Sequence, residues 1–247
     1  MPLEQPTPPL SARVAELNAE FAAQSTETLL ARCLDNAAIG RLALVSSFGV
    51  DSIVLLDMIA RLDRNLPVLF IDTELLFAET LSYQRQVADR LGLGDLRVLR
   101  PGRETLFHRD PDGMLRVFHP DACCDLRKRQ PLERGLRGFD AWISGRKRFQ
   151  GGQRQNMPLF EVDPGAGDSP RLKINPLANW QPQDLRAYIR RHDLPLHPLT
   201  KRGFSSLGCR PCTTPTKPGE APRAGRWRGL PKTECGLHLP PPEGRER

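Results

Sequence analysis

The sequence has few aromatic residues and no long apolar run. Aromatic side chains make up 6% of the 247 residues, and no stretch approaches the roughly 18 to 20 uninterrupted apolar residues that span a bilayer. The first ten residues lack the basic-then-apolar order of a secretory signal, so we expect a cytoplasmic protein without a membrane anchor. Neither GxxxxGK[ST] nor GxGxxG occurs, which argues against a P-loop NTPase and a dinucleotide-binding Rossmann unit.

Cysteine is also scarce, and its use limits the chemistry. The chain has six cysteines, and a reducing compartment disfavours stable disulfides, so metal ligation or catalysis is the favoured role. The formal net charge of +7 suggests an anionic partner, which charge alone does not identify. Few aromatic residues lie among the basic stretches, so base stacking on a nucleic acid is not expected.

Apolar periodicity predicts strands that alternate with helices along most of the chain. This order predicts an α/β fold with a mostly parallel sheet sandwiched by helices. We expect a helical segment at 1–40, a nucleotide-binding domain at 41–200, and a CxxC loop with a flexible tail at 201–247. Ser11 and Ser25 or Thr26 are candidate helix caps. The expected strands are 41–47, 67–73, 96–101 and 139–145, and the expected helices are 11–21, 26–37, 53–63, 77–92, 124–136 and 182–194.

Two strand ends carry candidate ligand-binding residues. The turn "SSFGVDS" at 46–52 combines serine hydroxyls with a glycine before a helix, which suits a phosphate group. The next strand ends in "IDT", and its polar side chains lie at the same sheet edge. An ordinary capped turn explains both features equally well. The candidate residues are Ser46, Ser47, Gly49, Ser52, Asp72 and Thr73.

A glycine-rich loop after the fourth expected strand is strongly basic. "GRKRFQGGQR" holds Arg146, Lys147, Arg148 and Arg154, and arginine suits planar recognition of phosphate or sulfate. A solvated basic loop is the alternative interpretation.

Four of the cysteines have the spacing of metal ligands. Cys209 and Cys212 form a CxxC motif, and Cys123 and Cys124 are adjacent. One zinc ion would need both adjacent side chains directed to a single tetrahedron, whereas in a [4Fe-4S] cluster they can ligate different irons. The spacing therefore favours a cluster over zinc, and zinc over free thiols.

The other two cysteines differ from each other. Cys33 lies in an expected amphipathic helix and is interpreted as a buried apolar residue. Cys235, in "KTECGLHL", is flanked by Lys232 and His238 beyond any regular element. A thiol among cations ionises more readily and can act as a nucleophile, although a tail cysteine can also be incidental.

Taken together, the motifs resemble those of the sulfonucleotide reductases, the family of adenylyl sulfate and 3′-phosphoadenylyl sulfate reductases. The resemblance spans about residues 40 to 240: the serine-glycine turn, IDT with LFAETL, CC, the GR-rich loop, CxxC, RAGRW and ECGLH, in that order. It implies an adenine nucleotide alpha-hydrolase type of fold. The CC and CxxC pairs resemble the iron-sulfur branch, whose members mostly use adenylyl sulfate. Two departures are Glu74 and Ala78, where the family commonly has glycine and proline.

The resemblance also implies a reaction and roles for matching residues. Cys235 would attack the sulfate sulfur, releasing AMP and leaving an S-sulfocysteine from which thioredoxin or glutaredoxin releases sulfite. His238 would lie near the nucleophile, and Lys128 between cluster and substrate. Gly145 would contact the adenosine with the two strand-end motifs, and Arg154, Arg223 and Arg226 would surround the phosphosulfate. The [4Fe-4S] ligands would be Cys123, Cys124, Cys209 and Cys212.

Other functions compete with this interpretation. Phosphoadenylyl sulfate is an alternative substrate, because one or two side chains can admit or exclude the 3′-phosphate. A second alternative is an ATP pyrophosphatase-type sulfurtransferase of the same fold, which usually shows a fuller SGGxDS turn. A third is a zinc module that binds nucleic acid. Whether the chain forms a homo-oligomer is left open.

Overall fold

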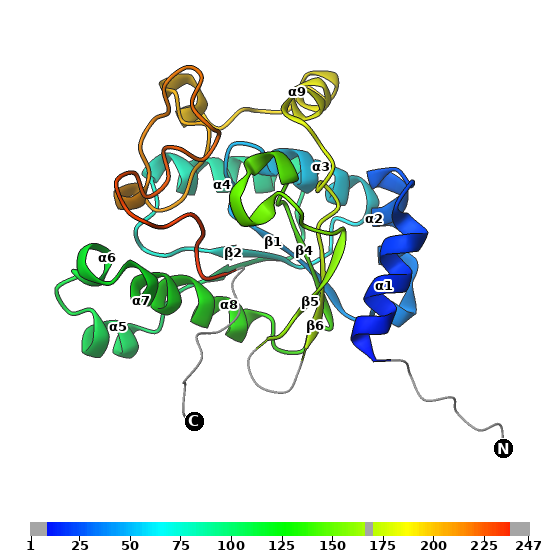
Figure 1. Ribbon diagram of the computed structural model, residues 1–247, viewed down its shortest axis with the longest axis horizontal. Coiled ribbons are helices and arrows are strands. Elements are labelled where there is room, and N and C mark those ends of the chain that lie inside the picture. Colours follow the sequence, from blue (N-terminus) through cyan, green and yellow to red (C-terminus); the bar gives the residue numbers. More distant parts are fainter. Residues whose placement is uncertain (1–8, 166–169, 238–247) are drawn as a thin grey trace.

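A six-stranded sheet forms the centre of the computed structural model, which describes residues 9–165 and 170–237 (Figure 1). The strand order is β3-β2-β1-β4-β6-β5, and every neighbouring pair is parallel except β5 with β6. The strands are β1 Leu42–Ser46, β2 Val68–Ile71, β3 Leu96–Leu99, β4 Ala141–Ser144, β5 Phe160–Asp163 and β6 Arg171–Ile174. The expected α/β fold with a mostly parallel sheet is confirmed.

Helices cover both faces of the sheet (Figure 1). Side chains alternate along each strand, so Leu42 and Leu44 of β1 join the larger core with α3, while Ala43 joins a smaller core with α8. The helices are α1 Leu10–Phe21, α2 Thr26–Asp35, α3 Ser52–Leu62, α4 Ala78–Leu91, α5 Arg103–Arg109, α6 Leu115–Phe118, α7 Pro120–Cys124, α8 Gln130–Gly135 and α9 Pro182–Arg191. None of these helices is long and apolar enough to cross a membrane.

Most expected elements are present, with small shifts at their ends. The Ser25 side chain accepts a hydrogen bond from the Thr28 amide and caps α2 as predicted. Ser11 does not cap a helix, because α1 already begins at Leu10, after Pro9. The short helices α5 and α6 and the antiparallel pair β5–β6 were not expected. The β5–β6 pair extends the sheet beyond β4, with β5 as the edge strand.

The expected helix at 124–136 is interrupted by a π-helical turn at Asp125–Arg129. Pro131, in the first turn of α8, has no amide hydrogen to donate to the carbonyl four residues earlier, so that carbonyl lacks its regular helical partner. The Gln130 amide instead donates to the Asp125 carbonyl, five residues back. The widened turn carries Lys128, which is buried, and it follows directly after the adjacent cysteines.

The sheet has its topological switch point between β1 and β4. From β1 the chain moves outward through β2 to β3, and it then returns to the other side of β1 as β4. Loops that leave two strands in opposite directions open a crevice at their carboxyl ends. The segment after α9 has no long helix or strand in its described part. It crosses the strand ends from the α4 side to the α7 side (Figure 1, yellow to red).

Candidate active site

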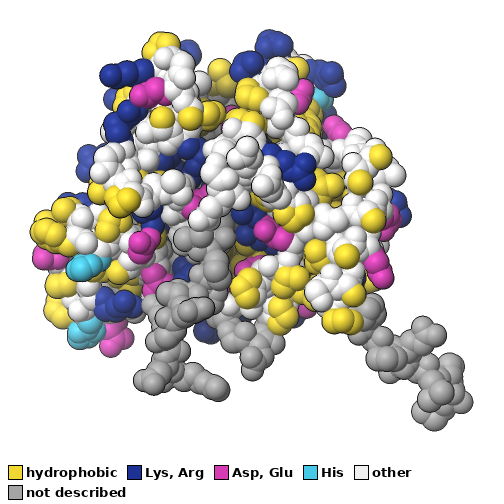
Figure 2. Space-filling view, viewed as in Figure 1, with side chains coloured by type: hydrophobic (Ala, Val, Ile, Leu, Met, Phe, Trp, Pro, Cys, Tyr) yellow, Lys and Arg dark blue, Asp and Glu magenta, His cyan; other side chains and the backbone are white. Residues whose placement is uncertain are grey.

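A cavity lies at this switch point, and three parts of the chain supply most of its lining. The turn after β1, the loop after β4 and the C-terminal segment contribute its walls. Figure 2 shows a hollow in the middle of the displayed face with Lys and Arg side chains inside it. Its lining holds six cationic side chains (Lys128, Arg146, Lys147, Arg154, Arg223, Arg226) and two carboxylates (Asp51, Glu234). The excess of positive charge suits an anionic ligand.

The turn after β1 is held by its own serines. The Ser46 hydroxyl accepts from the Phe48 amide at 3.2 Å, and the Ser52 hydroxyl accepts from the Gly49 amide at 2.9 Å. Phe48 takes a left-handed conformation (φ 46°) and is fully buried, packing edge-on against Phe70. The large residue therefore fills the core and leaves the cavity free. The structure places Ser46, Ser47, Gly49 and Ser52 at the cavity wall.

The two candidate residues at the end of β2 differ in whether they reach the cavity. Thr73 lines the cavity. Asp72 does not: its carboxylate accepts from the Glu74 amide at 3.0 Å and from Arg100 Nε at 3.2 Å. Glu74 has a φ of 61°, a conformation that favours glycine, so the hydrogen bond from its amide to Asp72 helps to hold a strained turn. Asp72 thus has a structural role in this arrangement.

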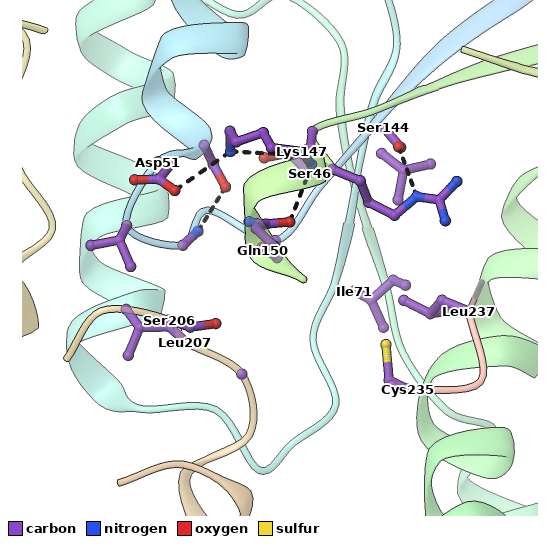
Figure 3. A pocket seen from close by; sticks show the side chains of 18 of the residues that line it. Ser46, Asp51, Ile71, Ser144, Lys147, Gln150, Ser206, Leu207, Cys235 and Leu237 are labelled. Carbon is purple, nitrogen blue, oxygen red and sulfur yellow. Dashed lines mark hydrogen bonds and ion pairs between the residues drawn. The ribbon is translucent and has the colours of Figure 1, made fainter. Parts of the chain in front are cut away.

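The loop after β4 lines the cavity with more residues than expected. Gly145 is there, together with Arg146 and Lys147, both buried. Lys147 Nζ donates to the Gly145 carbonyl at 3.0 Å and lies 3.5 Å from Asp51 Oδ2 (Figure 3). Sequence reasoning noted these two cations without assigning them a role, because a basic loop does not reveal which side chains turn inward. Burial lowers the pKa of Lys147, an effect that the Asp51 charge opposes.

Arg148, from the same loop, faces elsewhere. Its Nε donates to the Met157 carbonyl at 2.7 Å and its Nη1 to Asn179 Oδ1 at 2.7 Å. The Arg146 guanidinium contacts the Glu161 carboxylate. Burial and the nearby charge of Arg154 lower the pKa of Arg146 to about 10, so it stays cationic at neutral pH. Of the four cations in this loop, Arg146, Lys147 and Arg154 line the cavity and Arg148 does not.

The C-terminal segment brings Cys235 to the cavity. Cys235 is buried, with 9% of its surface exposed, and its sulfur lies beside Ile71 and Leu237 (Figure 3). The neighbouring Glu234 was not assigned a role from the sequence. Its carboxylate accepts from Arg154 Nε at 2.6 Å and Nη2 at 2.9 Å, and from Arg223 Nη2 at 3.3 Å. It also accepts from the Cys235 amide at 3.0 Å.

These contacts fix the charge of Glu234. Burial alone would raise its pKa, but hydrogen bonds and charge from Arg154, with the Arg223 charge and the Cys235 amide, lower that pKa to about 2. Burial also lowers the pKa of Arg223 to about 10. At neutral pH the Glu234 carboxylate and the Arg223 guanidinium are therefore both ionised.

Arg226 also lines this cavity, and one of its N–H donors is unused. Its Nη1 donates to the Leu207 carbonyl at 2.7 Å, and its guanidinium stacks 4.4 Å from the Trp227 ring centroid. Its buried Nε has no acceptor in the described part of the chain. A buried donor without an acceptor is costly, and an anionic ligand in this cavity would supply one. His238 lies outside the described residues.

A second, smaller cavity holds the four paired cysteines. Cys123, Cys124, Cys209 and Cys212 all line it, along with Arg127 and Lys128. Lys128 lines the larger cavity as well, so the two cavities share this residue. Thr73 also links them, because its hydroxyl lies 3.2 Å from Cys209 Sγ. Burial raises the pKa of the Cys123 thiol to about 12 and also raises those of Cys124 and Cys212.

The donor chemistry of this cavity fits an iron-sulfur cluster. Its candidate ligands are four thiols, without a histidine or carboxylate among the lining residues, and soft sulfur donors select such clusters. Within residues 9–165 and 170–237, no three His, Cys, Asp or Glu side chains converge closely enough to hold a single metal ion.

Cys33 is separate from both cavities. It lies in α2 and is buried against the main core, and burial raises its thiol pKa to about 12.

Comparisons with known proteins agree on one family. Residues 41–215 match the family described as "Phosphoadenosine phosphosulfate reductase domain". The chain is 46% identical over 235 residues to the "Adenosine 5'-phosphosulfate reductase" of Chelativorans sp. (strain BNC1), covering 94% of each chain. It is 45% identical over 230 residues to the protein of that name from Mesorhizobium japonicum, covering 93% of this chain and 89% of the relative. A "Phosphoadenosine 5'-phosphosulfate reductase" from Gloeobacter violaceus is 40% identical over 201 residues, covering 80% and 82%.

Solved structures show the same fold. The phosphoadenylyl-sulfate reductase of Candida auris, solved as a phosphate complex, is 26% identical, has a TM-score of 0.71, and is matched over 84% of this chain and 99% of that one. The FMN adenylyltransferase of Candida glabrata is 16% identical, with a TM-score of 0.57 over 89% of this chain and 71% of that one. At that identity the second likeness concerns the fold alone, and the expected fold is confirmed by the Candida auris structure.

Proposed function

The chain belongs to the phosphoadenosine phosphosulfate reductase family, and from this premise we propose that it reduces adenylyl sulfate to sulfite and AMP in assimilatory sulfate reduction. Two relatives matched over most of their length carry the name adenosine 5'-phosphosulfate reductase. The observation that carries the proposal is the meeting of Cys235 with the cationic lining and the serine turn in one cavity.

The adenosine end of the substrate would lie at the switch point between β1 and β4. The cavity lining here includes Ser46, Ser47, Gly49, Ser52 and Gly145. Glycine at both places lets the chain approach a ligand closely. Thr73 also lines the cavity, whereas the Asp72 carboxylate is engaged elsewhere and is left out of the proposed binding set.

The anionic end would lie among the arginines near Cys235. A thiolate that approaches a sulfate group meets a Coulomb barrier of about 4 kcal/mol for unit charges about 4 Å apart at an effective dielectric constant of about 20. Arg154, Arg223, Arg226 and Lys128 line the same cavity, and fixed positive charge there offsets this repulsion. The cations would bind the substrate and also lower the barrier to attack.

The proposed reaction has two steps. The Cys235 thiolate attacks the sulfate sulfur, the bond from that sulfur to the AMP phosphate oxygen breaks, and AMP leaves with the bonding electron pair. Reduced thioredoxin or glutaredoxin then attacks the Cys235 sulfur atom of the S-sulfocysteine through a mixed disulfide. Two donor thiols become a disulfide, sulfite leaves, and Cys235 returns as a thiol. This chemistry requires a reducing compartment, as the expected cytoplasmic location provides.

The smaller cavity would hold a [4Fe-4S] cluster. Cys123, Cys124, Cys209 and Cys212 are the proposed ligands, and the all-thiol lining supports them. When bound, the cluster would contribute to the electrostatics of the neighbouring site without net redox change. Lys128 lines both cavities and would place its positive charge between cluster and substrate.

A 3′-phosphorylated substrate is the second candidate, because the Gloeobacter violaceus relative is named for it. The test compares sulfite formation from adenylyl sulfate and from phosphoadenylyl sulfate, with reduced thioredoxin, in protein purified under nitrogen. We expect faster turnover of adenylyl sulfate. Higher kcat/KM with the 3′-phosphorylated nucleotide would reverse the assignment, and sulfite from neither would overturn it.

Cys235→Ser gives the matched control for this assay. The variant should bind nucleotide and keep the iron content of the parent protein, yet form no sulfite. An ATP pyrophosphatase-type enzyme would instead release pyrophosphate from ATP in both proteins, and that result would favour the sulfurtransferase alternative.

A further inference from the structure

The Glu234 carboxylate sits where an anionic ligand of Arg154 would bind. Two donors of the Arg154 guanidinium, Nε and Nη2, are taken by Glu234, and the third nitrogen, Nη1, donates to Gln150. With the C-terminal segment in this position, the bidentate Nε–Nη2 edge of Arg154 is not available to a phosphate or sulfate group, although Nη1 and Nη2 each keep one further N–H. A bidentate contact from this edge to the ligand therefore requires that Glu234 leave.

Four N–H donors converge on this one carboxylate. They come from Nε and Nη2 of Arg154, Nη2 of Arg223, and the Cys235 amide, at 2.6 to 3.3 Å. Bidentate guanidinium and backbone amide donors are the groups that bind tetrahedral oxyanions in proteins. The site around Glu234 is therefore a complete oxyanion site that contains one of the chain's own carboxylates.

We propose that Glu234 is a built-in substitute for the substrate's anionic group, which holds Arg154 and Arg223 while the cavity has no nucleotide and is displaced by the phosphosulfate group. The exchange replaces one anion by another, so the buried guanidiniums are never left unpaired, which would be costly. The carboxylate and the incoming group compete for the same four donors.

The exchange also acts on the nucleophile. Glu234 Oε1 accepts from the amide of Cys235, so displacement of Glu234 frees a backbone donor next to the reacting sulfur. Substrate binding would thereby change the position of the segment that carries Cys235. Glu234 is a positioning residue in this scheme and does not touch the reacting atoms. The inference rests on the proposed function only for the identity of the displacing anion.

Glu234→Gln tests the substitution, because the amide keeps the shape of the side chain and removes its charge. Ligand binding is measured by calorimetry on the full chain in a Cys235→Ser background, which prevents turnover. Adenylyl sulfate should bind roughly tenfold more tightly to the double variant, since its competitor for charged donors is weakened. Adenosine, which has no anionic group, should bind with unchanged affinity.

The adenosine measurement separates competition from a structural role. If Glu234 only holds the C-terminal segment in place, its replacement should leave the affinity for both ligands unchanged or lower it. Either result overturns the proposal. Glu220→Gln is the matched control, because Glu220 also pairs with an arginine of this segment, Arg228, but lies outside the cavity lining. It should leave both affinities unchanged. Should Glu234→Gln not fold, Glu234→Ala removes the acceptor altogether and should gain at least as much.

Inorganic sulfate distinguishes the two proposals. Tighter sulfate binding in the Glu234→Gln background, with no sulfite formed from nucleotides by the parent protein, would sink the proposed reaction and leave the anion exchange standing. Sulfite formation by the parent protein, with no gain in sulfate or adenylyl sulfate affinity in the variant, would sink the exchange alone.

Discussion

Acidification should loosen the wall of the larger cavity through one buried histidine. His197 is fully buried. Its Nδ1 accepts from the Leu199 amide at 3.2 Å, so this nitrogen carries no proton, and its Nε2 lies 3.1 Å from the hydroxyl of Thr80. Thr80 lines the cavity. Protonation of Nδ1 would break the cap that starts the short helical turn Pro198–Arg202, from which the chain continues to Cys209.

The magnitude follows from the pKa of His197. Burial lowers this pKa from its ordinary value of 6.5 to about 4, and the charge of Glu79 opposes the shift. Between these two values the unfolded chain binds more protons than the folded one, so stability falls as the pH falls through this window. The free energy of unfolding should drop by about 2 kcal/mol between about pH 7 and about pH 5 from this residue alone, and by about 3 kcal/mol below pH 4.

His197→Asn isolates the effect. The Asn Oδ1 can still accept from the Leu199 amide as a cap, but the side chain does not titrate. Urea unfolding of both proteins at about pH 7 and about pH 5 gives the difference, and other titrating groups cancel between them. The parent protein should lose about 2 kcal/mol more than the variant over this interval. An equal loss in both proteins would refute the assignment of a buried, neutral His197.

Three further substitutions test the packing near the site and in the main core. Gly208→Ala would place a Cβ 2.2 Å from Arg226 Nη2, and the Arg226 side chain can move away from it. Equilibrium dialysis should therefore show that adenylyl sulfate binds about tenfold more weakly, while the melting temperature stays unchanged. Unchanged affinity would mean that Arg226 does not hold the ligand. Gly225→Ala would place a Cβ 2.1 Å from the Thr214 carbonyl, a backbone atom, so urea unfolding should show a loss of about 1–3 kcal/mol, and no loss would contradict this close approach. Cys33→Ala should cost ~1 kcal/mol as a core change and leave sulfite formation and iron content intact, and lost iron would make Cys33 a ligand.

The fold could be predicted from the sequence because strong apolar periodicity marks most of its elements. The strand that becomes β1 is buried at four of its five residues, and the helix that follows, α3, is buried over most of its residues, so both segments are rich in apolar residues. The four-residue strands β5 and β6 are harder to recognise. β6 contains Arg171 and Lys173, which are buried through ion pairs with Glu133 and Glu161. Such pairing depends on tertiary contacts and leaves no periodic pattern.

The residues of the candidate site also fall into two groups: those whose position the sequence indicates and those whose position depends on tertiary contacts. Motif residues such as Ser46, Gly49 and Cys235 reach the cavity, because their positions follow from strand ends and from the order of the motifs. Asp72 does not, because an aspartate at a strand end serves equally well as a turn cap. Glu234 escaped notice because nothing in the sequence indicates that its carboxylate meets Arg154, which lies 80 residues earlier.

The central claim is that Cys235 takes a sulfo group from a nucleotide. The most direct test of this claim is mass spectrometry of the peptide that contains Cys235, after the protein has been incubated with adenylyl sulfate in the absence of a reductant. The account predicts one added SO3 on this cysteine and on no other, removed as sulfite when reduced thioredoxin is added. Sulfite formation under turnover without that adduct, or with the adduct on Cys123, Cys124, Cys209 or Cys212, would contradict it.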